Sequence, residues 1–246
     1  YSRALHMYQD KNYNGCIDQM THLLELNPSL QQREEADYYI AMSATANGDA
    51  NAKELLNSFL ENYPTSLHRI EVVKSIGDCY FSKGEYAEAL SQYNLVDEET
   101  LSENNKEDYI YRKAYSNLML ANYSDAERGF MRMSASKKYA NSSKFYCGYI
   151  AYVKKQYDDA MTYFNQVNAN SELGDMSNYY KSQIYFVKGD YAKAQNMASK
   201  LLNKNVDALY LAEANRIVGE SKYNLGDVSG AIPYLETYVK SVNVSL

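Results

Sequence analysis

The chain has 246 residues, a formal net charge of −6 and a sequence pI of about 5.2. Its acidic and basic residues alternate instead of forming blocks, which argues against a nucleic-acid partner, because such partners normally require a basic stripe. No run of about 18 apolar residues occurs, so the sequence predicts no membrane-spanning helix. Tyrosine reaches 27 residues while tryptophan is absent, so tyrosine carries much of the packing.

The cysteines and histidines show no spacing that indicates chemistry. The three cysteines, Cys16, Cys79 and Cys147, form no Cys-x-x-Cys pair, so we expect buried free thiols and no structural zinc. The histidines are far apart, and no phosphate loop or nucleophile elbow is present. The sequence therefore predicts no enzyme, no metal site and no cofactor.

In chain order, helix–turn–helix units follow one another along the whole sequence. A turn residue followed by a small residue, as in Tyr86/Ala89, recurs at intervals of 37, 36, 37, 34, 34 and 37 residues. This alignment gives seven units, with approximate boundaries 1–30, 31–65, 66–102, 103–139, 140–173, 174–207 and 208–246.

The expected helices follow from the units. First helices are expected at about 32–46, 66–83, 106–120, 142–154, 176–188 and 208–225. Second helices are expected at about 14–26, 52–62, 86–96, 124–133, 157–167, 191–202 and from 228 to about 239. Pro28 and Pro64 end the first two units, because proline cannot continue a helix, and Pro233 is expected in the first turn of the last helix. The acidic stretch 97–108 is interpreted as a solvated linker.

The clearest repeat lies between Gly77 and Val96. Small and large residues alternate there at Gly77, Tyr80, Gly84, Tyr86, Ala89 and Tyr93. This spacing resembles the tetratricopeptide repeat, a helix–turn–helix unit of roughly 34 residues. The resemblance implies an all-α fold, a right-handed superhelical solenoid of about seven such units. Tyr1 matches a position inside a first helix, so we expect the single array 1–246 to be part of a longer chain.

The resemblance also implies a binding groove. In this family the concave wall comes from the first helix of each unit, and here the matching positions are rich in aromatic residues. The candidate groove residues are Tyr38, Phe81, Tyr111, Tyr115, Phe145, Tyr149, Tyr152, Tyr179, Phe186 and Tyr223. Tyrosine is a common anchor for peptides. The alternative is that these rings pack between neighbouring units.

One kind of partner is disfavoured. Co-chaperone members of the family hold a peptide's terminal carboxylate with Lys and Asn at the fifth and ninth positions of one unit. Here Lys74 is followed by Asp78, and no other unit supplies the set. Heat-shock chaperone tails are therefore poor candidates.

A second resemblance concerns Phe59–Leu90. These 32 residues are similar to repeats of bacterial cell-envelope proteins, and the Tyr- and Asn-rich composition resembles large repeat proteins of Bacteroides-like bacteria. The resemblance favours the periplasm or cell envelope over the cytoplasm.

The sequence thus predicts a non-catalytic scaffold that binds a peptide segment or protein surface in the groove. Two alternatives stay open: a structural or oligomerisation segment of a larger envelope protein, with possible self-association, and the sensor domain of a regulator. The identity of the partner does not follow from the residues.

Overall fold

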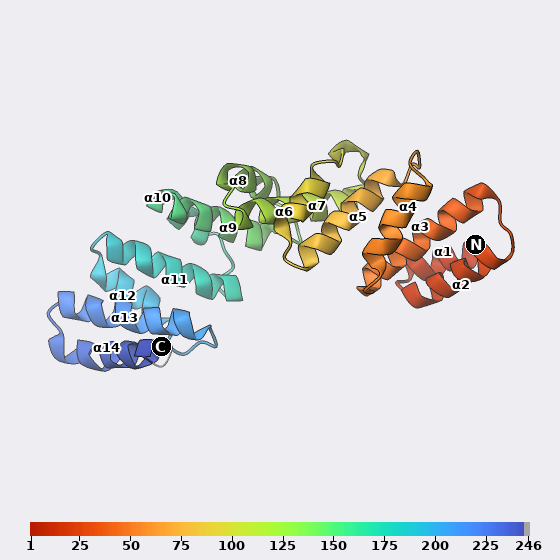
Figure 1. The fold of residues 1–246 in the computed structure, drawn as a ribbon. Coiled ribbons are helices and arrows are strands. Elements are labelled where there is room, and N and C mark those ends of the chain that lie inside the picture. Colours follow the sequence, from red (N-terminus) through yellow and green to blue (C-terminus); the bar gives the residue numbers. More distant parts are fainter. Residues whose placement is uncertain (244–246) are drawn as a thin grey trace. The chain divides into compact units, whose positions relative to one another are not determined.

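The computed structural model describes residues 1–243 and is α-helical, with one short 3₁₀ helix and no strand in that range. The helices follow one another as antiparallel pairs (Figure 1). Their bounds are α1 Ser2–Gln9, α2 Tyr13–Glu25, α3 Leu30–Asn47, α4 Ala52–Asn62, α5 Arg69–Ser82, α6 Tyr86–Tyr93, η1 Glu98–Thr100, α7 Glu103–Met119, α8 Tyr123–Arg132, α9 Ala140–Val153, α10 Tyr157–Phe164, α11 Glu172–Val187, α12 Tyr191–Ser199, α13 Ala208–Asn224 and α14 Val228–Asn243.

The chain forms two compact units, residues 1–129 and 130–246, which are described separately. Unit 1 contains α1 to α7 and most of α8, and unit 2 contains α9 to α14. In both, the first helix of a pair (an A helix) packs on its partner (a B helix) and on the A helix of the next pair, as in α3–α5 and α11–α13. The A helices therefore form one layer within each unit. One array over all 246 residues, and its right-handed superhelix, stay predictions.

The turn inside each pair is the same throughout. One residue has a left-handed backbone, with φ between 50° and 90°, at Lys11, Gly48, Gly84, Ala121, Lys155, Gly189 and Gly226. The N–H of the following residue then bonds to the carbonyl five residues earlier, as in Glu85 N to Tyr80 O at 3.0 Å. This is the Schellman ending of a helix, which satisfies carbonyls that the helix leaves free. The turn residues are 37, 36, 37, 34, 34 and 37 residues apart, the intervals that the sequence indicates.

Helix pairs approach most closely where one of them has a glycine. A Cβ on Gly77 of α5 would lie 2.7 Å from the ring of Tyr93 of α6, and one on Gly148 of α9 would lie 2.8 Å from Phe164 of α10. Both rings are almost completely buried. The glycines thus admit a flat aromatic ring where another residue would hold the helices apart.

Several predicted helix boundaries and one predicted proline position are wrong, and α5 and α6 show the reasons. Helix α5 begins at Arg69 and not at Ser66, because the Ser66 hydroxyl accepts the backbone N–H of His68 at 3.0 Å and forms a turn there. Helix α6 ends at Tyr93 and not at Val96, because the next residues bond three residues back, which tightens the last turn. Pro233 lies in the second turn of α14, where the helix continues past it.

Candidate functional site

The predicted groove residues all lie on A helices, but they divide between the two units. Tyr38, Phe81, Tyr111 and Tyr115 belong to unit 1, and the other six belong to unit 2. Tyr38 and Phe145 are buried, Tyr223 is 61% exposed, and the remaining seven are half-buried. The predicted set is thus two aromatic groups, which differ in how much ring surface they leave to a ligand.

In unit 1 an aromatic cluster joins α5, α6 and α7. The ring centroid of Phe81 lies 5.7 Å from those of both Tyr86 and Tyr115, and Tyr111 stacks beside Tyr115 at 6.5 Å. The Arg112 guanidinium lies 5.6 Å from the centre of the Phe81 ring. Tyr86 is on a B helix and was not among the predicted residues, although its place directly after the Gly84 turn could have indicated it.

Beside this cluster, Asp78 is the centre of a buried polar network. Its carboxylate is 12% exposed and lies 2.7 Å from Lys74 Nζ and 2.9 Å from Arg112 Nη1. It also accepts the Tyr93 hydroxyl at 2.7 Å. Burial and the Asp78 charge raise the pKa of Tyr93 above its usual range, so Tyr93 keeps its proton and donates.

This network bears on the carboxylate clamp that the sequence disfavours. Lys74 is the one residue of unit 1 that matches the clamp, and its side chain is 9% exposed and paired with Asp78. A peptide carboxylate would have to displace Asp78 from a buried ion pair, which costs several kcal/mol. The geometry therefore supports the view that heat-shock chaperone tails are poor partners.

A second set of hydrogen bonds connects successive A helices in unit 1. Tyr38 donates to Glu71 at 2.5 Å, and Glu71 accepts from Asn105 at 3.1 Å. The His68 ring stacks on Tyr38 with 3.9 Å between centroids. Burial, followed by the Glu71 carboxylate, raises the pKa of Tyr38. Tyr38 therefore packs and bonds between helix pairs, and its buried ring leaves little surface for a ligand.

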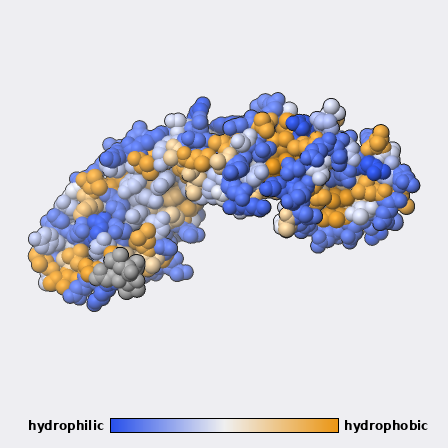
Figure 2. All heavy atoms as spheres, in the orientation of Figure 1, coloured by the Kyte–Doolittle hydropathy of each residue, from blue (hydrophilic) through white to orange (hydrophobic). Residues whose placement is uncertain are grey.

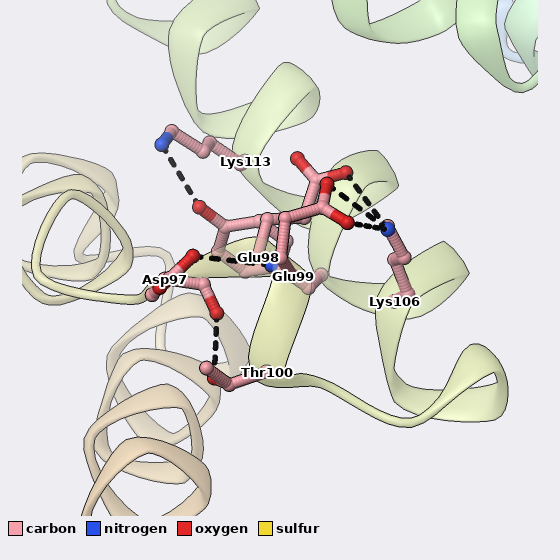
Figure 3. A network of polar contacts seen from close by, with 7 residues as sticks. Asp97, Glu98, Glu99, Thr100, Lys106 and Lys113 are labelled. Carbon is pink, nitrogen blue, oxygen red and sulfur yellow. Dashed lines mark hydrogen bonds and ion pairs between the residues drawn. The ribbon is translucent and has the colours of Figure 1, made fainter.

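The acidic stretch 97–108 is structured, because it contains η1 and the start of α7, although Asp97, Glu99 and Thr100 are exposed as the sequence predicts. Figure 3 shows Lys106 paired with Glu98 and Glu99, and its Nζ lies 3.3 Å from Glu99 and 3.8 Å from Glu98. Asp97 caps the short helix η1 through the backbone N–H of Glu99 at 3.2 Å. Leu101 is buried beneath the loop, so the stretch packs on unit 1.

In unit 2 the aromatic residues gather around Tyr180 of α11. Its ring lies 5.0 Å from the ring centroids of Tyr152 and Tyr179, and 5.6 Å from that of Tyr149. It also stacks on Phe164 of α10 at 5.5 Å. Burial raises the pKa of Tyr180 above its usual range. Sequence analysis missed Tyr180, because the repeat positions placed Tyr179 in the groove and gave its neighbour no role.

The far end of this A-helix layer carries an arginine between two carboxylates. Arg216 of α13 contacts Glu213 through Nε at 3.0 Å and Nη2 at 2.8 Å, and Glu220 through Nη1 at 2.9 Å. Its guanidinium lies 5.7 Å from the centre of the Phe186 ring. Tyr223, one helical turn beyond Glu220, presents most of its ring to solvent.

A cavity of about 430 Å³ lies elsewhere in unit 1, between α3 and the connection from α4 to α5. Its walls include Glu34, Glu35, Tyr63 and His68. Both oxygens of Glu35 already have partners, His68 at 3.0 Å and Tyr1 at 3.0 Å, and the Tyr63 hydroxyl donates to Asp37. None of the ten predicted groove residues lines this cavity.

The titratable groups are arranged for packing. Burial raises the thiol pKa of Cys16 and of Cys79, so neither is an activated thiolate. Cys79 is half-buried, whereas Cys16 and Cys147 are buried. In the described part of the chain, no group of three His, Cys, Asp or Glu residues could hold a metal ion. Over the same residues, no helix is both long and apolar enough to cross a membrane.

Comparison with known proteins shows which fold the chain shares. The tetratricopeptide repeat model matches residues 35–66, which cover most of α3, all of α4 and the connection after it. A tetratricopeptide repeat protein from Parabacteroides merdae has a similar structure, with 14% sequence identity, a TM-score of 0.56, and coverage of 98% of this chain and 91% of that one. The chain folds as a tetratricopeptide-repeat protein.

Two further solved structures show the same fold. YrrB, described as a tetratricopeptide repeat protein with an unusual peptide-binding site, is 19% identical, with a TM-score of 0.62 over 80% of this chain and 97% of that one. The apo quorum sensor NprR from B. thuringiensis is 14% identical, with a TM-score of 0.63 over 98% and 74%. No curated protein sequence matches this chain. At these identities the likeness concerns the fold, and the resemblance to Bacteroides-like proteins fits the Parabacteroides structure.

Proposed function

We propose that this tetratricopeptide-repeat protein is a non-catalytic scaffold whose A-helix layers bind a peptide segment or a protein surface. The fold supports a role in protein interaction, since repeats of this kind are generally scaffolds without catalysis. The layer of unit 2 is the stronger candidate, because it combines half-buried rings with the exposed ring of Tyr223.

One observation carries the proposal: the ring contacts fix the aromatic residues in place and still leave ring surface to solvent. Tyr149, Tyr152 and Tyr179 each contact the Tyr180 ring and are half-buried. A ring held by its neighbours loses little rotamer freedom when a ligand binds, so more of the contact energy appears as affinity. Phe145 is buried and supports this layer from behind, and Tyr38 is likewise buried in the layer of unit 1.

A structural or oligomerisation role is the second candidate. It is favoured by the number of groove tyrosines that already have partners, above all Tyr38 with Glu71 and His68. If such contacts account for the whole aromatic lining, the rings serve packing between repeats, and the layer binds no peptide.

The test separates these roles with matched tyrosine variants. The parent chain, a layer variant Tyr149→Ser/Tyr223→Ser and a B-helix control Tyr123→Ser/Tyr163→Ser would be screened against a displayed library of random twelve-residue peptides. Circular dichroism establishes that each variant is folded. We expect enriched peptides to bind the parent and the control but to lose at least about tenfold in affinity for the layer variant. Peptides that bind all three equally, or an absence of enriched peptides, would favour the structural role.

A further inference from the structure

The A-helix layer of unit 2 carries one arginine held between two carboxylates. All three guanidinium nitrogens of Arg216 donate to carboxylate oxygens, Nε and Nη2 to Glu213 and Nη1 to Glu220, over 2.8 to 3.0 Å. We call these three residues of α13 the α13 triad. Two carboxylates against one guanidinium leave the triad with one negative charge. Because the six predicted groove residues of unit 2 are uncharged, the triad adds this charge to a neutral set of rings.

The triad faces the aromatic residues of the two preceding A helices. The Phe186 ring of α11 lies 5.7 Å from the Arg216 guanidinium. Burial raises the pKa of Tyr152 on α9 and of Tyr179 on α11, and the charge of Glu213 adds to the effect at both hydroxyls. The triad therefore belongs to the same surface as the half-buried rings.

The cation of the triad is already engaged, whereas its carboxylates can accept further hydrogen bonds. The bonds from Arg216, and one from Gln183 of α11 at 3.5 Å, all reach the Oε2 atoms of the two carboxylates. Among the described residues, none donates to Oε1 of Glu213 or of Glu220, and the Glu220 side chain is 38% exposed. A cationic group would form charge-assisted hydrogen bonds there, whereas an acidic group would compete with two carboxylates for Arg216.

The chain's own arginines show how such a surface holds a guanidinium. Arg216 lies over the Phe186 ring while its nitrogens bond to carboxylates. In unit 1, Arg112 has the same combination, 5.6 Å from the centre of the Phe81 ring and 2.9 Å from Asp78. The face of an aromatic ring attracts a cation, and the planar guanidinium stacks on it. A carboxylate next to a ring is therefore a suitable site for an arginine side chain.

Glu220 and Tyr223 offer this combination to a ligand. They are three residues apart on α13 and so lie side by side, and Tyr223 is 61% exposed. Figure 2 shows hydrophilic and hydrophobic residues interspersed on the face of unit 2 that it draws. A purely apolar segment would cover polar groups without pairing them, which costs free energy.

We propose that the A-helix layer of unit 2 binds a peptide segment through an arginine side chain, whose guanidinium bonds to the carboxylates of the α13 triad and stacks on a neighbouring tyrosine. This inference rests on the function proposed above and names the chemistry of the partner. Lysine has the same charge but lacks the planar group that stacks on a ring, so arginine is preferred.

Three displayed peptide libraries test this chemistry. Each contains random twelve-residue peptides with one fixed central residue, which is arginine, alanine or glutamate, and each is selected on the 246-residue chain. The affinities of the enriched peptides would be measured by fluorescence anisotropy. We expect peptides from the arginine library to bind at least about tenfold more tightly than those from the other two, because hydrogen bonds to a charged group are the stronger ones.

Three variants of the chain locate the contact. For peptides from the arginine library, Glu213→Gln/Glu220→Gln should lower the affinity about tenfold. Arg216→Gln removes the internal cation from both carboxylates, so it should not lower the affinity. The control Asp159→Asn/Glu236→Gln removes two negative charges from exposed positions of α10 and α14 and should leave the affinity unchanged. Circular dichroism establishes that each variant is folded.

Two results would overturn the inference and leave the scaffold function standing. One is that peptides from the alanine or glutamate library bind as tightly as those from the arginine library. The other is that arginine peptides bind Glu213→Gln/Glu220→Gln as tightly as the parent, or are weakened by Arg216→Gln, because the carboxylates would then not be their anchor. If none of the three libraries yields a binder, the proposed function fails together with this inference.

Discussion

At the scale of single residues, the turns differ in how well their residue suits the backbone. Lys155 has φ 59°, a left-handed value that costs a residue with a Cβ roughly 1–2 kcal/mol, whereas the equivalent positions 84 and 189 are glycine. We expect Lys155→Gly to raise the free energy of unfolding by about 1 kcal/mol, after the added freedom of the unfolded chain is subtracted. Urea denaturation measures it.

The neighbouring lysine is the control for that prediction. Lys154 has φ −74°, an ordinary helical value. Lys154→Gly should lower stability, because glycine adds only flexibility there. If both variants shift the urea midpoint in the same direction, backbone strain at residue 155 is not the cause.

A second residue-scale prediction concerns Asp78. Its carboxylate neutralises Lys74 and Arg112 in a site where Asp78 and Lys74 are 12% and 9% exposed. Asp78→Asn would leave both cations without their counter-charge, so we expect a loss of about 3 kcal/mol in the free energy of unfolding.

The exposed pair between Lys188 and Asp158, where the carboxylate is 93% exposed, provides the comparison. Asp158→Asn should change stability little, since water screens that charge. Chemical denaturation of both variants checks the difference. Equal effects of the two substitutions would mean that burial does not set the strength of the Asp78 network.

At the scale of helices, α5 and α6 approach each other closely at Gly77. Whether Gly77→Ala stabilises or destabilises the protein therefore tests how tightly the two helices are packed there. In an exposed helix, Gly→Ala stabilises by up to about 1 kcal/mol. At Gly77 the added methyl would meet the Tyr93 ring, which is fixed by its bonds to Asp78 and by Tyr109 packed edge-on at 5.7 Å. We expect Gly77→Ala to destabilise by about 2 kcal/mol. Thermal and urea unfolding would detect it, and a stabilised variant would show that the ring can move.

The pairs of helices were predictable because their signals are local. Gly84, Gly189 and Gly226 mark left-handed turns, and the prolines mark the ends of two units, so length and order follow from the sequence. The second helices end earlier than expected since their last residues, such as Val96 and Val167, bond three residues back. Hydrophobicity continues through that tightened turn, so periodicity alone cannot locate the end.

The candidate site was less predictable, for a physical reason. Repeat positions indicate which helix face a residue occupies, but burial depends on how closely the next helix approaches. Tyr179 and Tyr180 are adjacent and both aromatic, and only the place of Phe164 against Gly148 makes Tyr180 the centre of the cluster. The partner of Tyr38, Glu71, is 33 residues away and belongs to the next helix pair.

At the scale of the whole molecule, the buried tyrosines make the free energy of unfolding depend on pH in the alkaline range. Burial raises the pKa of Tyr8 to about 12 from 10.0, and the pKa values of Tyr38, Tyr93 and Tyr180 are raised as well. Their neutral form is favoured in the folded state, so the associated stability is present in full below pH 10. It is lost as pH rises from the unfolded pKa toward the folded ones.

Each such tyrosine should therefore lower the free energy of unfolding by about 1.4 kcal/mol per pH unit between pH 10 and its pKa in the folded state. Urea midpoints between pH 8 and pH 11.5, recorded with tyrosinate absorbance, check this. We expect the midpoint to be constant up to about pH 9.5 and then to fall steeply, with part of the absorbance change coinciding with unfolding. A midpoint independent of pH up to 11.5 would contradict the raised pKa values.

The repeated Schellman turn also has a consequence for how the chain acquires its structure. Each turn is closed by bonds among about six consecutive residues, and each helix packs chiefly on the next one along the chain. Little loop-closure entropy must be spent before contacts form, so folding should be rapid and should be able to start at any helix pair. The chain can therefore fold while it is being synthesised. Each helix pair would fold as it leaves the ribosome and pack on the pair that emerged before it.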